Sequence, residues 1–142
     1  MEINEVLAIL MFLSFIFLLF CDEWAIVAAE NGILSGRVYD VAENPVAGVE
    51  IFVYSSQNTR KPADFISPPT NNQGEFQVTL PAGNYWTVAR LRHGKERFGP
   101  LLPGDKHSGI PLEIEVEAGD TVEEDFIIAD LEETSRLAVK SD

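Results

Sequence analysis

The chain has 142 residues, with 10 Lys and Arg against 23 Asp and Glu, which gives a formal net charge of −13 at pH 7. This length predicts one compact domain. So acidic a protein lacks the phosphate-neutralising surface that nucleic-acid binding needs, and we expect no nucleic-acid partner. The single cysteine, Cys21, excludes an intramolecular disulfide and zinc sites built on paired cysteines.

Residues 1–29 have the character of an export signal. Residues 6–20 are apolar apart from Ser14, a length typical of the hydrophobic region of a signal peptide and short for a membrane span. Small side chains at Val27 and Ala29 predict cleavage that leaves a mature chain beginning at Glu30. The sequence therefore predicts an exported protein, periplasmic or extracellular.

Two alternatives to cleavage stay open. The segment ahead of the apolar stretch holds Glu2 and Glu5 and no Lys or Arg, which is unusual for a cleaved signal. Residues 6–20 would then remain as a membrane anchor, and a membrane contact is expected only in that case. Lipid attachment at Cys21 is the other alternative, although the bulky Phe20 precedes it.

The remaining chain alternates apolar and polar residues between turn sequences, a pattern typical of β-strands. We expect three hairpins in chain order, built from strands at residues 33–40 and 49–55, 75–80 and 85–92, and 112–117 and 121–128. No stretch has a convincing helical period. The prediction is an all-β fold, an antiparallel Ig-like or transthyretin-like β-sandwich of about seven strands over residues 30–132, followed by a tail over residues 133–142.

Four short motifs follow one another at suitable spacing: Gly36-x-Val38-x-Asp40, Pro45-Val46-Ala47-Gly48-Val49, Thr70-x-x-x-Gly74-x-Phe76 and Leu80-Pro81-Ala82-Gly83-x-Tyr85. Together they resemble the carboxypeptidase regulatory-like domain, also described as transthyretin-like or carbohydrate-binding-like, over Ile33 to Leu91. The resemblance implies a β-sandwich that serves as an accessory module, one that stabilises, presents or binds.

The residues predict no catalytic site, no metal site and no cofactor. Segment 98–111 contains Asp105 and His107, but its three prolines and three glycines favour an ordered covering loop over a catalytic one. The acidic residues between Asp120 and Asp125 match no known calcium-binding loop, and solvated strand faces explain them more simply. We therefore predict a protein that is not an enzyme.

Strand alternation places a second apolar surface opposite the core. If Val49, Ile51 and Val53 face the core, the residues on the opposite face are Phe52, Tyr54, Trp86 and Val88. Either the loops 56–69 and 98–111 cover this face, or it is an exposed platform for a sugar ring or a protein partner. We expect coverage, by Ile66, Pro68, Pro69, Leu101 and Leu102. The exposure of Trp86 distinguishes the two cases.

Charge is segregated along the chain. A basic cluster contains Arg90, Arg92, Lys95 and Arg97, whereas Glu113 to Glu133 contains ten acids and no Lys or Arg. We expect these groups to pair within one sheet, and the alternative is a docking patch for a neighbouring copy or another protein. The functional prediction is an exported non-enzymatic module with a structural or protein-interaction role. The alternatives are a carbohydrate-binding module and a membrane-anchored accessory subunit.

Overall fold

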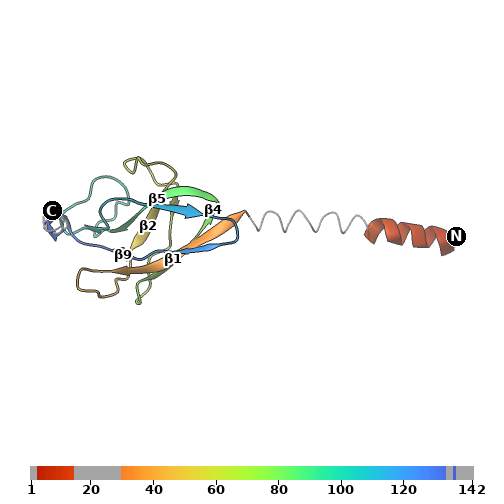
Figure 1. Ribbon diagram of the computed structural model, residues 1–142, viewed down its shortest axis with the longest axis horizontal. Helices are drawn as coiled ribbons and strands as arrows, with labels where there is room; N and C mark the ends of the chain where they lie inside the picture. Colours follow the sequence, from red (N-terminus) through yellow and green to blue (C-terminus); the bar gives the residue numbers. More distant parts are fainter. Residues whose placement is uncertain (1–2, 15–29, 134–135, 137–142) are drawn as a thin grey trace.

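The computed structural model describes residues 3–14, 30–133 and 136 (Figure 1). Residues 3–14 are helical, and no helix within the described ranges has both the length and the apolar character that crossing a membrane requires. Cys21, the end of the apolar segment and the cleavage site at Ala29 lie outside the described residues, as does most of the tail over 133–142. Signal processing, lipid attachment and the domain boundaries stay predictions.

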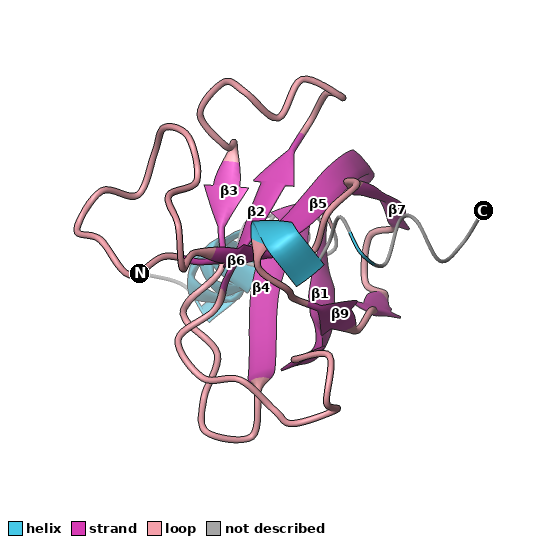
Figure 2. Ribbon diagram, turned by 90° about the vertical axis from the view of Figure 1, so that its left-hand side faces the viewer, coloured by secondary structure: helices cyan, strands magenta, loops and turns pink. Residues whose placement is uncertain are grey.

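Residues 30–133 form a sandwich of two β-sheets, which confirms the predicted all-β class (Figures 1 and 2). Its strands are β1 (Asn31–Tyr39), β2 (Glu50–Tyr54), β3 (Phe65–Ile66), β4 (Glu75–Pro81), β5 (Gly83–Leu91), β6 (Lys106–His107), β7 (Leu112–Val116), β8 (Thr121–Glu123) and β9 (Phe126–Ile127). One sheet has the order β4, β1, β8, with β9 also on β1. The other has the order β3, β2, β5, β6, with β7 also on β5.

The three expected hairpins are wrong, because each of the three turns joins strands of opposite sheets. β1 pairs with β4 rather than β2, β5 pairs with β2 rather than β4, and β8 pairs with β1 rather than β7. Alternation and turn composition show where a strand lies and which face is apolar, but they do not name its partner. Consecutive strands in opposite sheets can bury their apolar faces against each other across the core.

The sheet around β1 is mixed rather than purely antiparallel. β4 runs antiparallel to β1, whereas β8 and β9 run parallel to it. Between β8 and β9 the chain passes so close to β1 that a Cβ atom at Gly36 would stand 1.7 Å from the carbonyl oxygen of Glu124. Only glycine allows this approach of two backbones.

The core lies between the two sheets. As the alternation predicts, Phe76 and Leu80 of β4 are buried there and Val78 is partly buried. Phe76 packs against Phe126, whose ring centroid is 5.9 Å away. The other buried members of this cluster are Leu34, Val38, Val49, Ile51, Val53, Tyr85, Ala89, Ile114, Val116 and Ile128.

A single residue, Ala82, separates β4 from β5 although the two strands belong to different sheets. The Tyr85 hydroxyl donates a hydrogen bond of 2.6 Å to the carbonyl oxygen of Pro81, across this corner. The Tyr85 ring is buried, and the Phe65 ring meets it edge-on with a centroid distance of 6.0 Å. The tyrosine thereby ties the turn to the core, as the tyrosine corner of other sandwiches does.

Two residues of the sequence motifs hold loops at the ends of strands. The Asp40 carboxylate accepts backbone hydrogen bonds from Ala42 and Asn44, at 2.9 and 3.0 Å, and the bond from Asn44 is the main reason that the pKa of Asp40 lies below its usual value. The buried Thr70 hydroxyl accepts a bond of 2.9 Å from the Val49 amide. The motifs therefore encode turns that place β2 in the sheet opposite β1.

β3 and the segment that follows it cover the edge of β2 that faces away from β5. The buried Ser67 hydroxyl accepts a 2.8 Å bond from the Ile51 amide, and the Ser67 amide donates to the Ile51 carbonyl. Pro68 and Pro69 come next, and neither has an N–H group. This edge therefore presents few donors to another strand.

Candidate functional site

β2 and β5 lie side by side and present one face to the core and one face outward. The Cα partners on the outer face are Phe52 with Val88, Tyr54 with Trp86 and Glu50 with Arg90. None of these six belongs to the core cluster between the sheets, as the alternation predicts. The outer face of this sheet is therefore the place to search for a binding site.

Three of the four apolar residues on this outer face are covered, as expected, and do not form the exposed platform that was the alternative. Phe52 and Tyr54 are each 1% exposed and Val88 is 3% exposed, while Trp86 is partly buried. The buried rings of Phe52 and Tyr54 offer no surface on which a sugar could stack, whereas Trp86 keeps part of its surface exposed. At Phe52, Tyr54 and Val88 the outer face of the sheet is therefore covered.

Part of this cover is a cation rather than an apolar loop. The Arg90 guanidinium lies over the Phe52 ring, 4.9 Å from its centroid, and donates a 2.7 Å hydrogen bond from Nη1 to the Tyr54 hydroxyl. Of the expected covers, Ile66 and Leu101 are partly buried. The remaining three, Pro68, Pro69 and Leu102, are exposed. A guanidinium can cover aromatic faces because it is planar and weakly hydrated.

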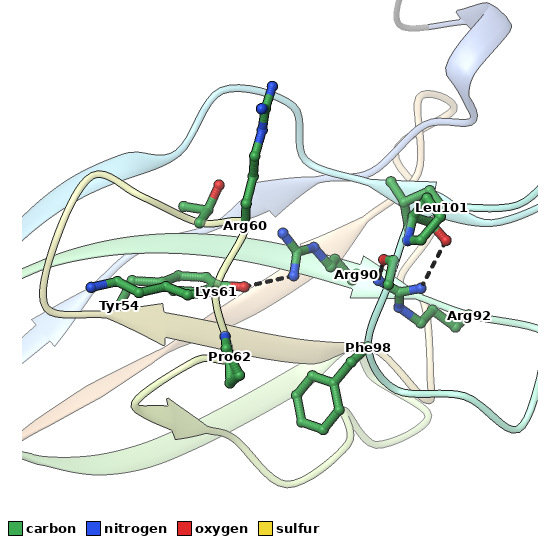
Figure 3. A pocket seen from close by; sticks show the side chains of 11 residues that line it. Tyr54, Arg60, Lys61, Pro62, Arg90, Arg92, Phe98 and Leu101 are labelled. Carbon is green, nitrogen blue, oxygen red and sulfur yellow. Dashed lines mark hydrogen bonds between the residues drawn. The ribbon is translucent and has the colours of Figure 1, made fainter.

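A cavity of about 520 Å³ opens beside this pair, where the loop after β2 faces the loop after β5 (Figure 3). Its lining contains four basic residues and no Asp or Glu, and consists of Tyr54, Thr59, Arg60, Lys61, Pro62, Arg90, Arg92, Phe98, Gly99, Pro100 and Leu101. In Figure 3 the Tyr54 hydroxyl and the Arg90 guanidinium meet, and Arg60 points away from them. We call this space the basic cavity.

Arg92 fixes one wall of the basic cavity. Its Nη2 and Nη1 donate to the carbonyl oxygens of Gly99 and Pro100, at 2.8 and 3.4 Å. Its Nε is buried and has no hydrogen-bond partner among the described residues. The arginine therefore anchors the loop after β5 while one of its donors stays unused.

The structure brings together the four residues of the expected docking patch. Arg90, Arg92, Lys95 and Arg97 line one smaller cavity of about 150 Å³ that also borders Phe52. Arg97 forms an ion pair with Glu50, a residue of β2. The patch adjoins the basic cavity, since Arg90 and Arg92 line both.

The basic cluster forms no ion pair with the described acids from Glu113 to Asp125. Ion pairs among the described residues include Arg37–Glu75, Arg97–Glu50 and Arg136–Glu132. None of these joins the cluster to an acid between Glu113 and Asp125, so the expected internal pairing is not found for those acids. Glu113, Glu115 and Glu117 of the segment are exposed, which leaves an acidic surface on and next to β7.

The polar residues of segment 98–111 have structural partners. The buried Asp105 carboxylate accepts backbone hydrogen bonds from His93 and Leu102, each of 2.9 Å, and these bonds hold the pKa of Asp105 below its usual value. The Nδ1 atom of His107 accepts a 3.0 Å bond from the Gly109 amide. Burial, and then the charge of Arg90, lower the pKa of His107. These contacts shape the loop and assemble no nucleophile with a base.

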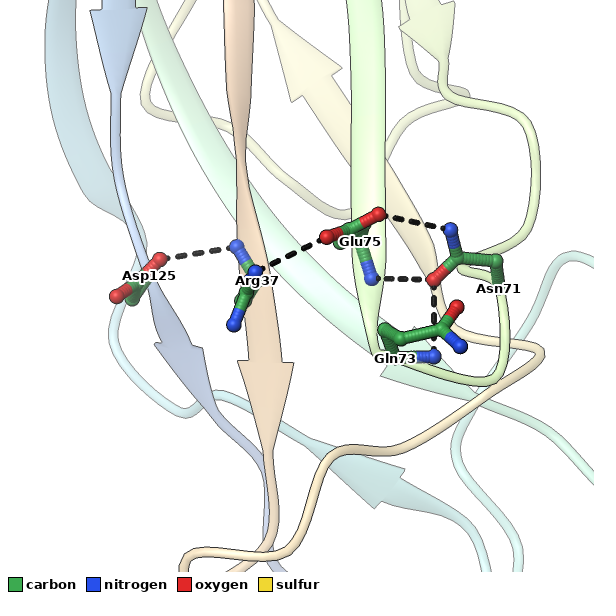
Figure 4. Close-up of polar contacts among 5 residues, drawn as sticks. All are labelled: Arg37, Asn71, Gln73, Glu75 and Asp125. Atoms are coloured by element: carbon green, nitrogen blue, oxygen red, sulfur yellow. Dashed lines mark hydrogen bonds and ion pairs between the residues drawn. The ribbon is translucent and has the colours of Figure 1, made fainter.

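The acidic residues considered for calcium lie at the other sheet, and one of them has a structural role (Figure 4). Asp125 accepts a 2.9 Å bond from the Arg37 amide, and the Arg37 side chain forms a 3.0 Å ion pair with Glu75. Asn71 donates to Glu75 and accepts from the Glu75 amide. Within residues 3–14, 30–133 and 136, no three His, Cys, Asp or Glu side chains are grouped to hold a metal ion.

Sequence reasoning missed the contribution of Arg60, Lys61 and Phe98 to the basic cavity. Arg60 and Lys61 lie about thirty residues before the basic cluster and in a different loop. Their only signal in the sequence is a pair of adjacent cations beside Pro62. Nothing in that pair indicates which part of the sandwich it will face.

No family model matches the chain, and no curated protein matches it. Similar solved structures include the Bacillus anthracis TIE protein, with 19% identity over 70% of this chain and 16% of that chain and a TM-score of 0.47. A DUF3823 family protein from Parabacteroides merdae has 16% identity over 71% of this chain and 47% of its own, with a TM-score of 0.44. GBS52, the minor pilin of Streptococcus agalactiae, has 18% identity over 70% and 44%, with a TM-score of 0.43.

This chain spans less than half the length of each of these three proteins. What the chain does must therefore be argued from its own residues.

Proposed function

We propose that this chain is an exported, non-enzymatic β-sandwich module that associates head to tail, with the docking patch of one copy on the acidic segment of the next. The observation that supports this most is the separation of charge within one domain. The patch and the acids from Glu113 to Asp125 have opposite signs, and no ion pair joins them among the described residues. A contact between unlike surfaces of identical chains leaves one of each free and can extend.

The two surfaces are complementary in exposure as well as in sign. Lys95 is exposed and forms no ion pair with a described residue, and Glu113 and Glu115 are exposed on β7. Exposed charges steer association and set its register more than they add affinity, so we expect a weak and salt-sensitive contact.

A non-enzymatic role agrees with how the polar groups are used. Asp105 and Asp125 both accept backbone hydrogen bonds that hold loops and strands in place. The resemblance to carboxypeptidase regulatory-like domains, carried by the motifs around Asp40, Thr70 and Tyr85, supports an accessory role as well.

Export is proposed from the apolar segment 6–20 and the small residues before Glu30. Mass spectrometry of the exported protein should show a chain that begins at Glu30. An intact N-terminus in the membrane fraction would instead favour the membrane-anchored accessory subunit.

Sedimentation velocity tests the association. The apparent mass should fall when the salt concentration rises from about 0.05 to about 0.5 M, because the Debye length then drops to roughly 4 Å. Lys95→Glu combined with Arg97→Gln should give a monomer at low salt. The matched control, Lys61→Glu with Arg60→Gln, changes the net charge equally outside both the patch and the acidic segment and should associate like the wild type. A wild-type protein that is monomeric at both salt concentrations refutes the proposal.

A further inference from the structure

The basic cavity has a composition that its surroundings do not explain. The chain has more than twice as many acidic as basic residues, yet four basic residues and no acidic one line this cavity. Cations that face one space repel one another, and the repulsion is stronger where protein walls replace water. An anion in the cavity would turn this repulsion into attraction.

Several donors in the cavity have no partner. Arg90 has five N–H groups, and the hydrogen bond that the structure shows from its side chain goes to Tyr54. The Nη1 and Nη2 atoms of Arg92 each donate one bond to a loop carbonyl and each keep a second N–H, whereas its buried Nε is not accessible from the cavity. The exposed Lys61 forms no ion pair with any described residue. Guanidinium groups match the two oxygens of a carboxylate, and Lys61 adds a mobile point charge at the mouth of the cavity.

The rim of the cavity is apolar and aromatic. Phe98 is 54% exposed, and Pro62 and Pro100 are exposed around the same opening. The Phe98 side chain projects from its loop beside Arg92 and Arg90 (Figure 3). The cavity therefore combines a cationic floor with a flat apolar surface at its edge.

The size and the hydroxyl groups of the cavity suit a small polar ligand better than a single side chain. About 520 Å³ falls within the range of small-molecule sites. Thr59 is partly buried in the lining, and its hydroxyl forms no hydrogen bond with a described residue. A ligand that fits has an anionic group, hydroxyls and a ring with an apolar face.

An extended peptide fits the same site less well. Peptides that lie along a β-sheet need a free strand edge for their backbone. Here the edge of β2 is occupied by β3 and by the segment that contains Pro68 and Pro69, and β5 is paired on both sides. No free edge of these two strands adjoins the cavity.

We propose that the basic cavity binds a carboxylated sugar of the hexuronate class. The carboxylate lies between Arg90, Arg92 and Lys61, the sugar ring lies against Phe98, and Thr59 exchanges hydrogen bonds with a ring hydroxyl. The proposed sugar site uses different residues from Phe52, Tyr54, Trp86 and Val88, the four that the sequence analysis considered for carbohydrate binding. It goes beyond the proposed head-to-tail contact, and because Arg90 and Arg92 border both the docking patch and the basic cavity, a bound sugar and a neighbouring copy would compete for them.

Calorimetric titration of the mature chain with a galacturonate trisaccharide tests the proposal, with a neutral galactose trisaccharide as the matched ligand. We expect the acidic sugar to bind at least about tenfold more tightly than the neutral one. Lys61→Glu should weaken acidic-sugar binding about tenfold and Phe98→Ala about fivefold. Arg136→Glu, which makes the same charge change away from both the basic cavity and the docking patch, should alter it by less than about twofold.

A footprint on the wild-type protein gives a second measurement that needs no variant. Bound galacturonate trisaccharide should protect the Lys61 amine from acetylation and leave Lys95 reactive. Three results would overturn the proposal: no binding at about 10 mM sugar, equal binding of acidic and neutral sugars, or tighter binding of a hexaglutamate peptide, which would indicate a protein partner. Loss of salt-dependent sedimentation alone would refute only the head-to-tail contact.

Discussion

The guanidinium of Arg90 donates a 2.7 Å hydrogen bond to the hydroxyl of Tyr54 on the neighbouring strand. The Tyr54 ring is 1% exposed, and the same guanidinium lies 4.9 Å above the Phe52 centroid. One basic side chain thus covers aromatic surface that would otherwise meet water. Arg90 also lines the basic cavity, so the packing of the sheet and the proposed site share a residue.

Tyr54→Phe removes the acceptor of this bond. We expect the free energy of unfolding to fall by about 1–2 kcal/mol, since a hydrogen bond from a charged donor contributes more than a neutral one. Urea denaturation measures the change. In an Arg90→Leu background the same substitution should cost about 0.5 kcal/mol or less, because the donor is already gone. Equal costs in both backgrounds would show that the bond adds nothing.

Phe76→Ala tests the core between the sheets. Phe76 is 6% exposed and packs against Phe126, so its loss should lower the free energy of unfolding by about 3–5 kcal/mol. Phe98→Ala removes an exposed ring of the same size and should cost less than about 0.5 kcal/mol. A loss below about 1 kcal/mol at Phe76 would contradict the strand phase.

Gly36→Ala tests the close approach of β1 to the chain between β8 and β9. The added Cβ would stand 1.7 Å from the Glu124 carbonyl oxygen, so the backbones must separate. We expect at least about 2 kcal/mol of destabilisation, measured by thermal unfolding. The matched change Gly94→Ala should be close to neutral, because the nearest heavy atom to its Cβ is 4.0 Å away.

Asp105→Asn tests the acid end of the stability profile. Two backbone N–H groups lower the pKa of Asp105 in the folded chain, whereas its unfolded value is about 3.9. The carboxylate therefore stabilises the fold above about pH 4, and this contribution is lost as the pH falls through the folded value. Thermal unfolding at several pH values should show lower stability at pH 7 and a shallower acid decline in the variant. An unchanged acid decline would contradict this account.

His107 makes the stability of the fold depend on pH in a second range, which lies above that of Asp105. Burial, and then the charge of Arg90, lower its folded pKa below the unfolded value of about 6.5. Its neutral form fits the fold, so stability is complete above about pH 6.5 and declines as the pH falls toward the folded pKa. His107→Gln should flatten the change in melting temperature between about pH 7 and pH 5.

Alternating side chains and turn residues predicted most strands of this protein to within a few residues. They placed Phe76 and Leu80 in the core and put Phe52 and Tyr54 on the opposite face of their strand. These properties are local, because burial of one strand face requires a two-residue period whatever the strand pairs with. The sequence also grouped Arg90, Arg92, Lys95 and Arg97, which lie together because they are close along the chain.

Only the tertiary structure decided which strands are partners and which loops meet. β1 and β2 belong to different sheets although a short turn joins them, and their apolar faces pack against each other across the core. The same folding brings Lys61 and Phe98 to the cavity beside Arg90. Composition and spacing by themselves determined an acidic β-sandwich with an apolar leader; the basic cavity exists because two loops, far apart in sequence, converge on the outer face of one sheet.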